Sequence, residues 1–219
     1  MRSMKKLTFL ILLLLSACTT IAPTRAPLLS PFGDGTQWIV WEDMQFVAKL
    51  NDHTQLSIIV PRGFVTDLAS TPKEIWSIYP PFGKYLSAAI LHDYLYWRQE
   101  CEPKEADEII YQTMRDAGVD QATQSRFYAA LQAAGDAAWV KNKSERANHL
   151  VRVIPSRYLS ISAGLLRPTT LWPQLRKELH KSNIFDEPTT DGESIKQACK
   201  ALGNEIVVKS GISAIVLGK

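Results

Sequence analysis

The segment ILHDYLYW, residues 90–97, carries ionisable residues where an apolar helix is expected. Helical spacing sets His92 and Tyr96 on one face together with Ala88, so the imidazole points where core residues point. Asp93 follows directly and points about 100° around the helix. A carboxylate bonded to one imidazole nitrogen leaves the other nitrogen to take a proton from water. The spacing therefore indicates acid–base chemistry, provided that a second carboxylate reaches His92.

Asp107, on the following helix, is the carboxylate expected to pair with His92. Its spacing to Ile110 and Met114 sets it on or beside the apolar face of that helix. Because an ionised carboxylate is costly to bury without a partner, pairing is the favoured outcome. If the two helices pack antiparallel, Asp107 meets His92, and Tyr96 donates to the same carboxylate. The alternative is a satisfied polar core, in which the pair only joins two helices.

Asp93 and Asp67 are the candidate oxygen ligands for a cation. Asp93 lies next to the proposed base, and Asp67 lies in the loop TDLAS that precedes the helices. Carboxylate oxygens suit calcium better than zinc, and the chain has no zinc spacing of the HExxH type. Asp67 could equally serve as an Asx-type turn residue. The sequence thus predicts a catalytic set, His92, Asp107 and Tyr96, with a calcium ion beside it.

The first 17 residues predict a bacterial signal peptide, with a basic start, an apolar run too short to span a bilayer and small residues at its end. The LSAC segment, residues 15–18, resembles the lipobox of bacterial lipoproteins. That resemblance implies cleavage before Cys18, acylation of Cys18 and, with Thr19 behind it, sorting to the periplasmic face of the outer membrane. The alternative is a plain secreted protein with an incidental cysteine.

The charge of the chain gives little support for a nucleic-acid partner. The whole chain carries a formal charge of +3, and the leader contributes three basic residues and no acidic ones. The mature chain is therefore formally neutral, and its expected tie to the membrane is the lipid.

The remaining chain is expected to form an α+β domain with extensions on both sides. Residues 18–35, rich in Thr, Pro and Ser, are predicted to be a tether between lipid and domain. Residues 36–140 are predicted to contain a β-hairpin around NDHT, a helix capped at Thr71, and three further helices. Those three are expected over residues 85–97, from Pro103 to Gly118, and over residues 121–140. Residues 141–219 are left as an extension with one amphipathic segment, LWPQLRKELHK, and a short apolar tail.

Cys101 and Cys199 are the two cysteines outside the lipobox. Exported proteins keep disulfides, so the two could pair. Because they lie far apart in sequence, two isolated thiols are the slightly favoured expectation.

Two resemblances add to this interpretation. HDYLY followed by EADEIIYQTM resembles secretory phospholipases that hydrolyse the sn-2 ester. This resemblance implies that His92 activates water, Asp93 binds calcium, and Tyr96 and Asp107 orient the histidine. The chain departs from that family, since the glycine-rich calcium loop and the disulfide ladder are absent and Leu95 replaces the usual cysteine.

The longer string VPRGFVTDLASTPKEIWSIYPPFGKYLSAAILHDYLY is similar to an uncharacterised domain family common in tailed phages and prophages. This second resemblance covers residues 37–139 and implies a domain type and a phage context. It brings no established activity.

The sequence therefore supports three functions. The first is a metal-assisted hydrolase acting on an ester in phospholipid or another envelope component. The second is a non-catalytic prophage lipoprotein that binds an envelope or phage protein, for example in superinfection exclusion. A nucleotide phosphohydrolase is the least favoured, because the additional upstream histidine expected there is absent.

Overall fold

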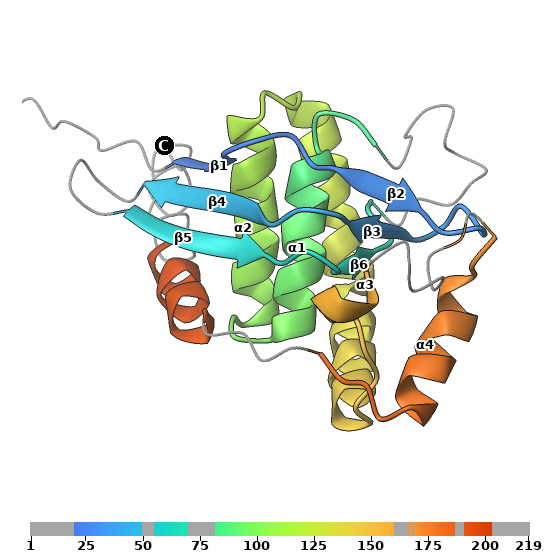
Figure 1. Ribbon diagram of the computed structural model, residues 1–219. Coiled ribbons are helices and arrows are strands. Elements are labelled where there is room, and N and C mark those ends of the chain that lie inside the picture. The colour runs from blue at the N-terminus through green and yellow to red at the C-terminus, as the bar shows by residue number, and fades with distance from the viewer. Residues whose placement is uncertain are drawn as a thin grey trace, which may run out of the picture.

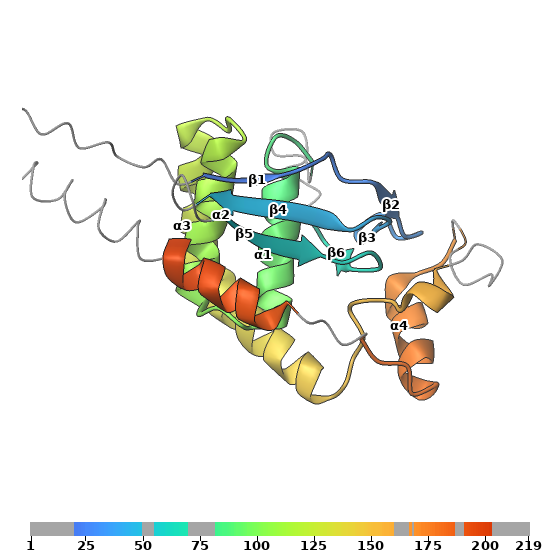
Figure 2. The same cartoon turned by 60° about the vertical axis from the view of Figure 1, so that its left-hand side comes forward.

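A computed structural model describes residues 20–49, 55–69, 82–159, 167, 169–186 and 191–202. Antiparallel strands form one layer, and helices pack against one face of it (Figure 1). After a turn of 60°, β4 (Met44–Lys49) and β5 (Gln55–Val60) still cross α1 (Leu86–Arg98) (Figure 2). This arrangement confirms the α+β fold expected from the sequence.

The strands form two small antiparallel sheets. The first contains, in spatial order, β1 (Thr20–Pro23), β4 (Met44–Lys49) and β5 (Gln55–Val60). The second contains β2 (Leu29–Pro31), β3 (Trp38–Val40) and β6 (Val65–Thr66). The predicted hairpin is confirmed, because β4 and β5 pair from Met44 with Val60 to Lys49 with Gln55. In β4 alternate side chains are buried, as expected of a strand with one face on the core: Met44, Phe46 and Ala48.

The tether predicted over residues 18–35 is wrong from Thr20 onward. Strand β1 pairs with β4, and Ile21 is fully buried in the main core. The backbone N–H of Ile21 also donates to Asp116 at 2.7 Å. Residues 29–31 form β2 and pair with β3. These strands were missed because a strand of three or four residues leaves too short a pattern to identify.

Three helices carry the centre of the domain. Helix α1 (Leu86–Arg98) is buried over most of its length, which matches its nearly continuous apolar sequence. Helix α2 (Pro103–Asp116) begins with a capping box between Glu102 and Glu105. Gly118 follows α2 with a φ of 68°, so glycine relieves strain at this turn.

Helix α3 (Gln121–Ala147) starts at Asp120, whose side chain accepts from the N–H of Thr123. The helix continues past the predicted domain boundary at residue 140. The boundary is therefore misplaced by seven residues, about two turns of helix, because polar residues on a solvated helix face resemble a linker in composition.

The chain after α3 packs back onto the domain. A short 3-10 turn (η2, Ser156–Tyr158) precedes α4 (Trp172–Lys181), which lies over the amphipathic segment identified in the sequence. Apolar residues of α4 pack with Phe32, Ile39 and Val65 of the second sheet region. In Figures 1 and 2, α4 lies beyond the second sheet, at the opposite side of the molecule from the helix over residues 192–202.

Residues 192–202 form a helix that joins the main core through Ile195, Ala198 and Leu202. Cys199 in this helix forms a disulfide with Cys101 in the turn between α1 and α2, with the two Cα atoms 5.6 Å apart. The expectation of isolated thiols is therefore wrong. Sequence separation says little about pairing once two segments pack on the same core.

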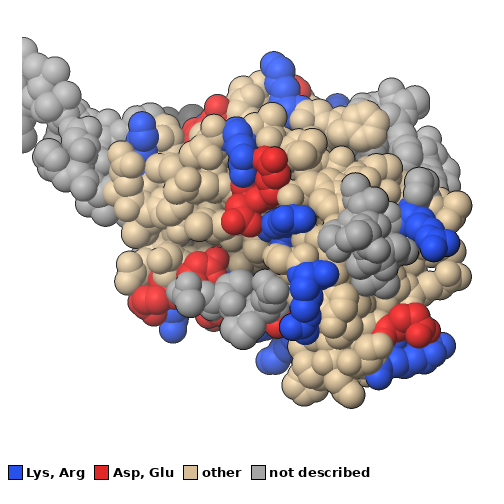
Figure 3. All heavy atoms as spheres, in the orientation of Figure 1, with Lys and Arg blue, Asp and Glu red and all other residues tan. Residues whose placement is uncertain are grey.

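Several predictions lie outside the described residues: lipidation of Cys18, the turn at residues 51–54, the helix capped at Thr71 and the apolar tail after residue 204. Among the helices that the structure describes, none combines the length and apolar character needed to cross a membrane. Basic and acidic side chains are interspersed on the face shown in Figure 3.

Candidate functional site

The predicted pair of His92 and Asp107 forms between α1 and α2. The imidazole Nε2 lies 2.9 Å from Asp107 Oδ1, and both side chains are buried. The Tyr96 hydroxyl donates to the same oxygen at 2.7 Å. These contacts confirm the predicted geometry. They follow from helical spacing, because His92 and Tyr96 lie one turn apart on the face of α1 that meets α2.

Helix α3 adds two residues to this network that the sequence did not reveal. Gln132 Nε2 donates to Asp107 Oδ2 at 3.1 Å, so the carboxylate accepts three hydrogen bonds. Gly135 packs against Tyr96, and a Cβ placed there would lie 2.6 Å from the tyrosine hydroxyl. A side chain at residue 135 would therefore displace the Tyr96 hydroxyl from Asp107.

Tyr96 is held as a neutral hydrogen-bond donor. Burial raises its pKa, and the hydrogen bond to Asp107 raises it further. Its ring contacts His92 at a centroid distance of 4.2 Å and Trp139 at 5.1 Å, edge to face. Packing on both sides thus fixes the ring, and the fixed ring limits how His92 can rotate.

A cavity of about 680 Å³ opens beside this network. His92, Asp93 and Tyr96 contribute to its wall, although only 6% of the His92 surface is exposed. Because Nε2 bonds Asp107, Nδ1 is the remaining nitrogen, and it makes no hydrogen bond within the described part of the chain. The arrangement can accept a proton at Nδ1 while Asp107 holds the opposite side of the ring.

Asp93 and Asp67, the predicted cation ligands, lie together on the cavity wall. Thr66 Oγ1 donates to Asp93 Oδ2 at 2.5 Å. Burial raises the pKa of Asp93 well above its usual range, and nearby Asp67 adds to this effect. Arg152 opposes the shift through its positive charge, with Nη2 lying 3.1 Å from Asp67 Oδ1 and 4.0 Å from Asp93 Oδ2.

The loop that presents Asp67 is closed by its neighbour. Thr66 Oγ1 accepts from the N–H of Leu68 at 2.9 Å, and Leu68 adopts a φ of 61°. A leucine rarely takes this left-handed conformation, so the surrounding contacts hold the loop there. Asp67 is therefore placed toward Arg152, while Thr66 supplies the side-chain bond expected of a turn residue.

Asp67 and Asp93 alone do not complete a calcium site. Calcium takes about six to eight oxygen ligands. Within the described ranges, no group of three or more His, Cys, Asp or Glu side chains could hold a metal ion. The guanidinium of Arg152 already lies against both carboxylates. We therefore derive no chemical step through calcium.

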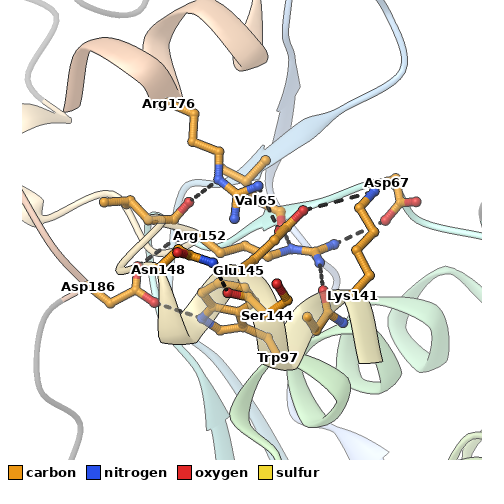
Figure 4. Close-up of polar contacts among 12 residues, drawn as sticks. Val65, Asp67, Trp97, Lys141, Ser144, Glu145, Asn148, Arg152, Arg176 and Asp186 are labelled. Carbon is orange, nitrogen blue, oxygen red and sulfur yellow. Dashed lines mark hydrogen bonds and ion pairs between the residues drawn. The ribbon is translucent and has the colours of Figure 1, made fainter. Parts of the chain in front are cut away.

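Arg152 is held by several contacts of its own (Figure 4). Its Nε donates to the carbonyl of Val65 at 2.9 Å, and its Nη1 donates to Asn142 Oδ1 at 3.0 Å. Asp186 accepts from the backbone N–H groups of residues 152 and 153 and from Trp97 Nε1. The positive charge beside Asp93 is thus fixed in position by its backbone as well as its side chain.

Arg176 of α4 lies beside Arg152 in the same wall (Figure 4). Its Nη1 pairs with Glu145 at 2.8 Å, and its Nε donates to the carbonyl of Val151 at 2.7 Å. Its Nη2 is buried, and no described residue offers it a hydrogen-bond partner. Neither Arg152 nor Arg176 belongs to a recognisable motif, so the sequence offered no signal for either.

No curated protein and no solved structure matches the chain significantly. One family model does match, and its description is a protein of unknown function (DUF1353). The match includes α1, α2 and the strands from β3 onward, and therefore His92, Asp93, Tyr96 and Asp107. It excludes Arg152 and Arg176. A DUF1353 domain of unknown function thus spans residues 38–131 of this chain.

Proposed function

We propose that this protein is a hydrolase that cleaves an ester in an amphiphilic component of the bacterial envelope. The observation that carries the proposal is the pair of His92 and Asp107 on the wall of a cavity, with Nδ1 of the imidazole left without a partner among the described residues. A buried pair that only joined two helices would have no need of an adjoining cavity.

In the proposed reaction His92 acts as the base. Asp107 accepts from Nε2–H, which leaves Nδ1 unprotonated and able to take a proton from water. The water oxygen bonds to the ester carbonyl carbon, and the proton on Nδ1 later passes to the departing alkoxide. The products are a carboxylic acid and an alcohol, and His92 returns to its starting state.

Tyr96 and Gln132 are positioning residues in this scheme. Both side chains donate a hydrogen bond to Asp107 and fix the orientation of its carboxylate. The carboxylate is thereby positioned to accept from His92. Arg152 lines the same cavity and is the proposed source of positive charge for the developing oxyanion. In secretory phospholipases, which the His-Asp segment resembles, calcium occupies the place next to the histidine.

The location of this activity is also a proposal. We propose that Cys18 carries the lipid and that the protein is held at the periplasmic face of the outer membrane. Strand β1 begins at Thr20, so the domain would lie close to the bilayer. Replacing Cys18 with Ser and labelling with palmitate tests this. Labelling that disappears supports the anchor, and equal labelling of both forms rules it out.

The activity is tested by incubating the wild-type protein with phospholipid vesicles and measuring fatty acid release, with and without calcium. Release that persists in the presence of a chelator supports a reaction that uses Arg152. If release requires calcium and calcium also raises the melting temperature, calcium is the cofactor of the reaction. No release from phospholipid or from simple esters contradicts the hydrolase proposal.

A non-catalytic envelope lipoprotein is the second candidate. The observation that favours it is the near-complete burial of His92, together with an Asp107 carboxylate that already accepts three hydrogen bonds. Its partner would be an envelope or phage protein. This candidate expects the cavity residues to affect stability alone, with no ester cleavage by the wild type.

A further inference from the structure

The cavity runs along one face of α3. The α3 residues in its wall recur every three or four positions: Phe127, Ala130, Leu131, Ala134, Gly135, Ala138, Lys141, Asn142 and Glu145. A helix rises about 27 Å between the first and the last of these. The wall therefore has two ends, and Gly135, which packs against Tyr96, marks the level of the His92 network between them.

The end near Phe127 is apolar. Ile110 from α2 and Ala89 from α1 join Phe127 and Leu131 there. The Phe127 ring also packs against Tyr85, with centroids 4.7 Å apart. Every side chain in this part of the wall that the structure describes lacks a charge, so it suits an alkyl chain.

The other end carries a basic excess. Four basic side chains line it, Lys141, Arg152, Arg176 and Lys177. Three acidic side chains face them, Asp67, Asp93 and Glu145. Burial raises the pKa of Asp93, which favours its neutral form and increases the positive excess.

Arg176 is a partly buried residue at this end with hydrogen-bonding capacity left over. Glu145 and the carbonyl of Val151 satisfy Nη1 and Nε, whereas Nη2 is buried and has no hydrogen-bond partner among the residues that the structure describes. A guanidinium donor that is buried and unsatisfied is unfavourable, and native proteins rarely retain one without a reason. Arg176 also lines the cavity, so an anionic ligand there would lie near this unsatisfied donor.

We propose that the basic end binds an oxyanion, phosphate or carboxylate, that belongs to an amphiphile whose alkyl chain lies along α3 toward Phe127. Arg176 is the principal contact, and Lys177 and Lys141 add longer-range attraction. The inference deepens the proposed hydrolase, because an amphiphile held at both ends would carry its ester past His92. Binding itself does not depend on catalysis.

Calorimetric titration of the full-length protein tests this with four probes: n-octyl phosphate, n-octanoate, n-octyl glucoside and inorganic phosphate. We expect the two anionic amphiphiles to bind more tightly than the neutral glucoside, which shares the chain, and than phosphate, which shares the charge. Equal binding of the glucoside would contradict the anionic end. Equal binding of inorganic phosphate would mean a free anion, and not an amphiphile, is the ligand.

Variants identify the residues. Arg176→Gln is expected to weaken n-octyl phosphate binding by about ten- to a hundredfold, the effect of removing a charged hydrogen bond, with partial recovery in Arg176→Lys. Lys177→Gln should weaken it by about two- to fivefold through lost surface attraction. Lys181→Gln is the matched control, because Lys181 is exposed on the same helix and does not line the cavity. Lys177→Gln remains informative if Arg176→Gln does not fold.

The outcomes separate this inference from the proposed function. Unchanged affinity in both Arg176→Gln and Lys177→Gln would overturn the oxyanion site and leave hydrolysis by His92 standing. Binding that follows the expected order in a protein that cleaves no ester would support the oxyanion site and contradict only the hydrolase.

Discussion

Asp107 and Asp93 are aspartates from neighbouring helices, and they differ in what surrounds them. Asp107 lies behind the cavity wall and accepts from a histidine, a tyrosine and a glutamine. Asp93 lies on the wall, next to a second carboxylate, Asp67, and a guanidinium. The first environment orients an imidazole without placing a full positive charge beside it. The environment of Asp93 places two carboxylates and a guanidinium on the cavity wall, where a ligand would bind.

The difference teaches how one helix can serve two purposes. Consecutive residues His92 and Asp93 point in different directions from α1, so one faces α2 and the other faces Thr66 at the end of β6. The His92 cluster, which consists of His92, Tyr96, Asp107 and Gln132, contains residues of helices only. The Asp93 cluster consists of Asp93, Asp67 and Arg152, and Arg152 follows α3 in the sequence. The two clusters should therefore respond differently to mutation.

The largest effect is expected from Arg152→Met, which leaves Asp67 and Asp93 facing each other without their cation. The cost should be about 3 kcal/mol, near the lower end for breaking a buried pair, because Asp67 is 35% exposed. Urea unfolding measures it. The double variant with Asp93→Asn should recover part of the loss. A cost below about 1 kcal/mol, the range of surface pairs, would show that the charge cluster is unimportant to stability.

Asp107→Asn is expected to cost about 1–3 kcal/mol, because the amide places a donor against groups that also donate. Asp136→Asn, on the exposed side of α3, is the matched control. It should change the free energy of unfolding by about a few tenths of a kcal/mol, as ordinary surface substitutions do. A similarly small change for Asp107→Asn would contradict the network described around this carboxylate.

Gly135→Ala is expected to cost about 1–3 kcal/mol through overpacking against the Tyr96 hydroxyl. Tyr96→Phe removes that hydroxyl, so the alanine should cost less in the Tyr96→Phe background. Additive effects in this double-mutant cycle would mean that Gly135 is needed for some reason other than room for Tyr96.

The smallest effect concerns pH. Because the pKa of Asp93 is raised in the folded state, the folded protein retains a proton that the unfolded chain releases. Asp93 therefore lowers stability as pH rises from its ordinary value through its raised value. The stability of Asp93→Asn relative to wild type should increase over that window. A difference that is constant or decreases with pH would contradict the raised pKa.

The two clusters also differ in how far they could be predicted. His92, Tyr96 and Asp107 were found because helical periodicity relates residues within one or two turns, and a short turn joins α1 to α2. Arg152 meets Asp67 across 85 residues of sequence, and no periodic signal spans that distance. The same reason hid the disulfide, whose cysteines are 98 residues apart. Gln132 and Gly135 lie on a helix that was predicted, but its rotation relative to α1 was not.

The central claim is that His92 is a base held by Asp107, and His92→Gln tests it most directly. The glutamine retains some volume and hydrogen bonding but cannot take the proton. Ester hydrolysis by the wild type, His92→Gln and the exposed-histidine control His149→Gln should be measured together with their unfolding free energies. The account predicts a loss of about 10²–10⁴-fold for His92→Gln with stability largely intact, and no loss for the control. A destabilised His92→Gln protein that hydrolyses ester as fast as the wild type would contradict it.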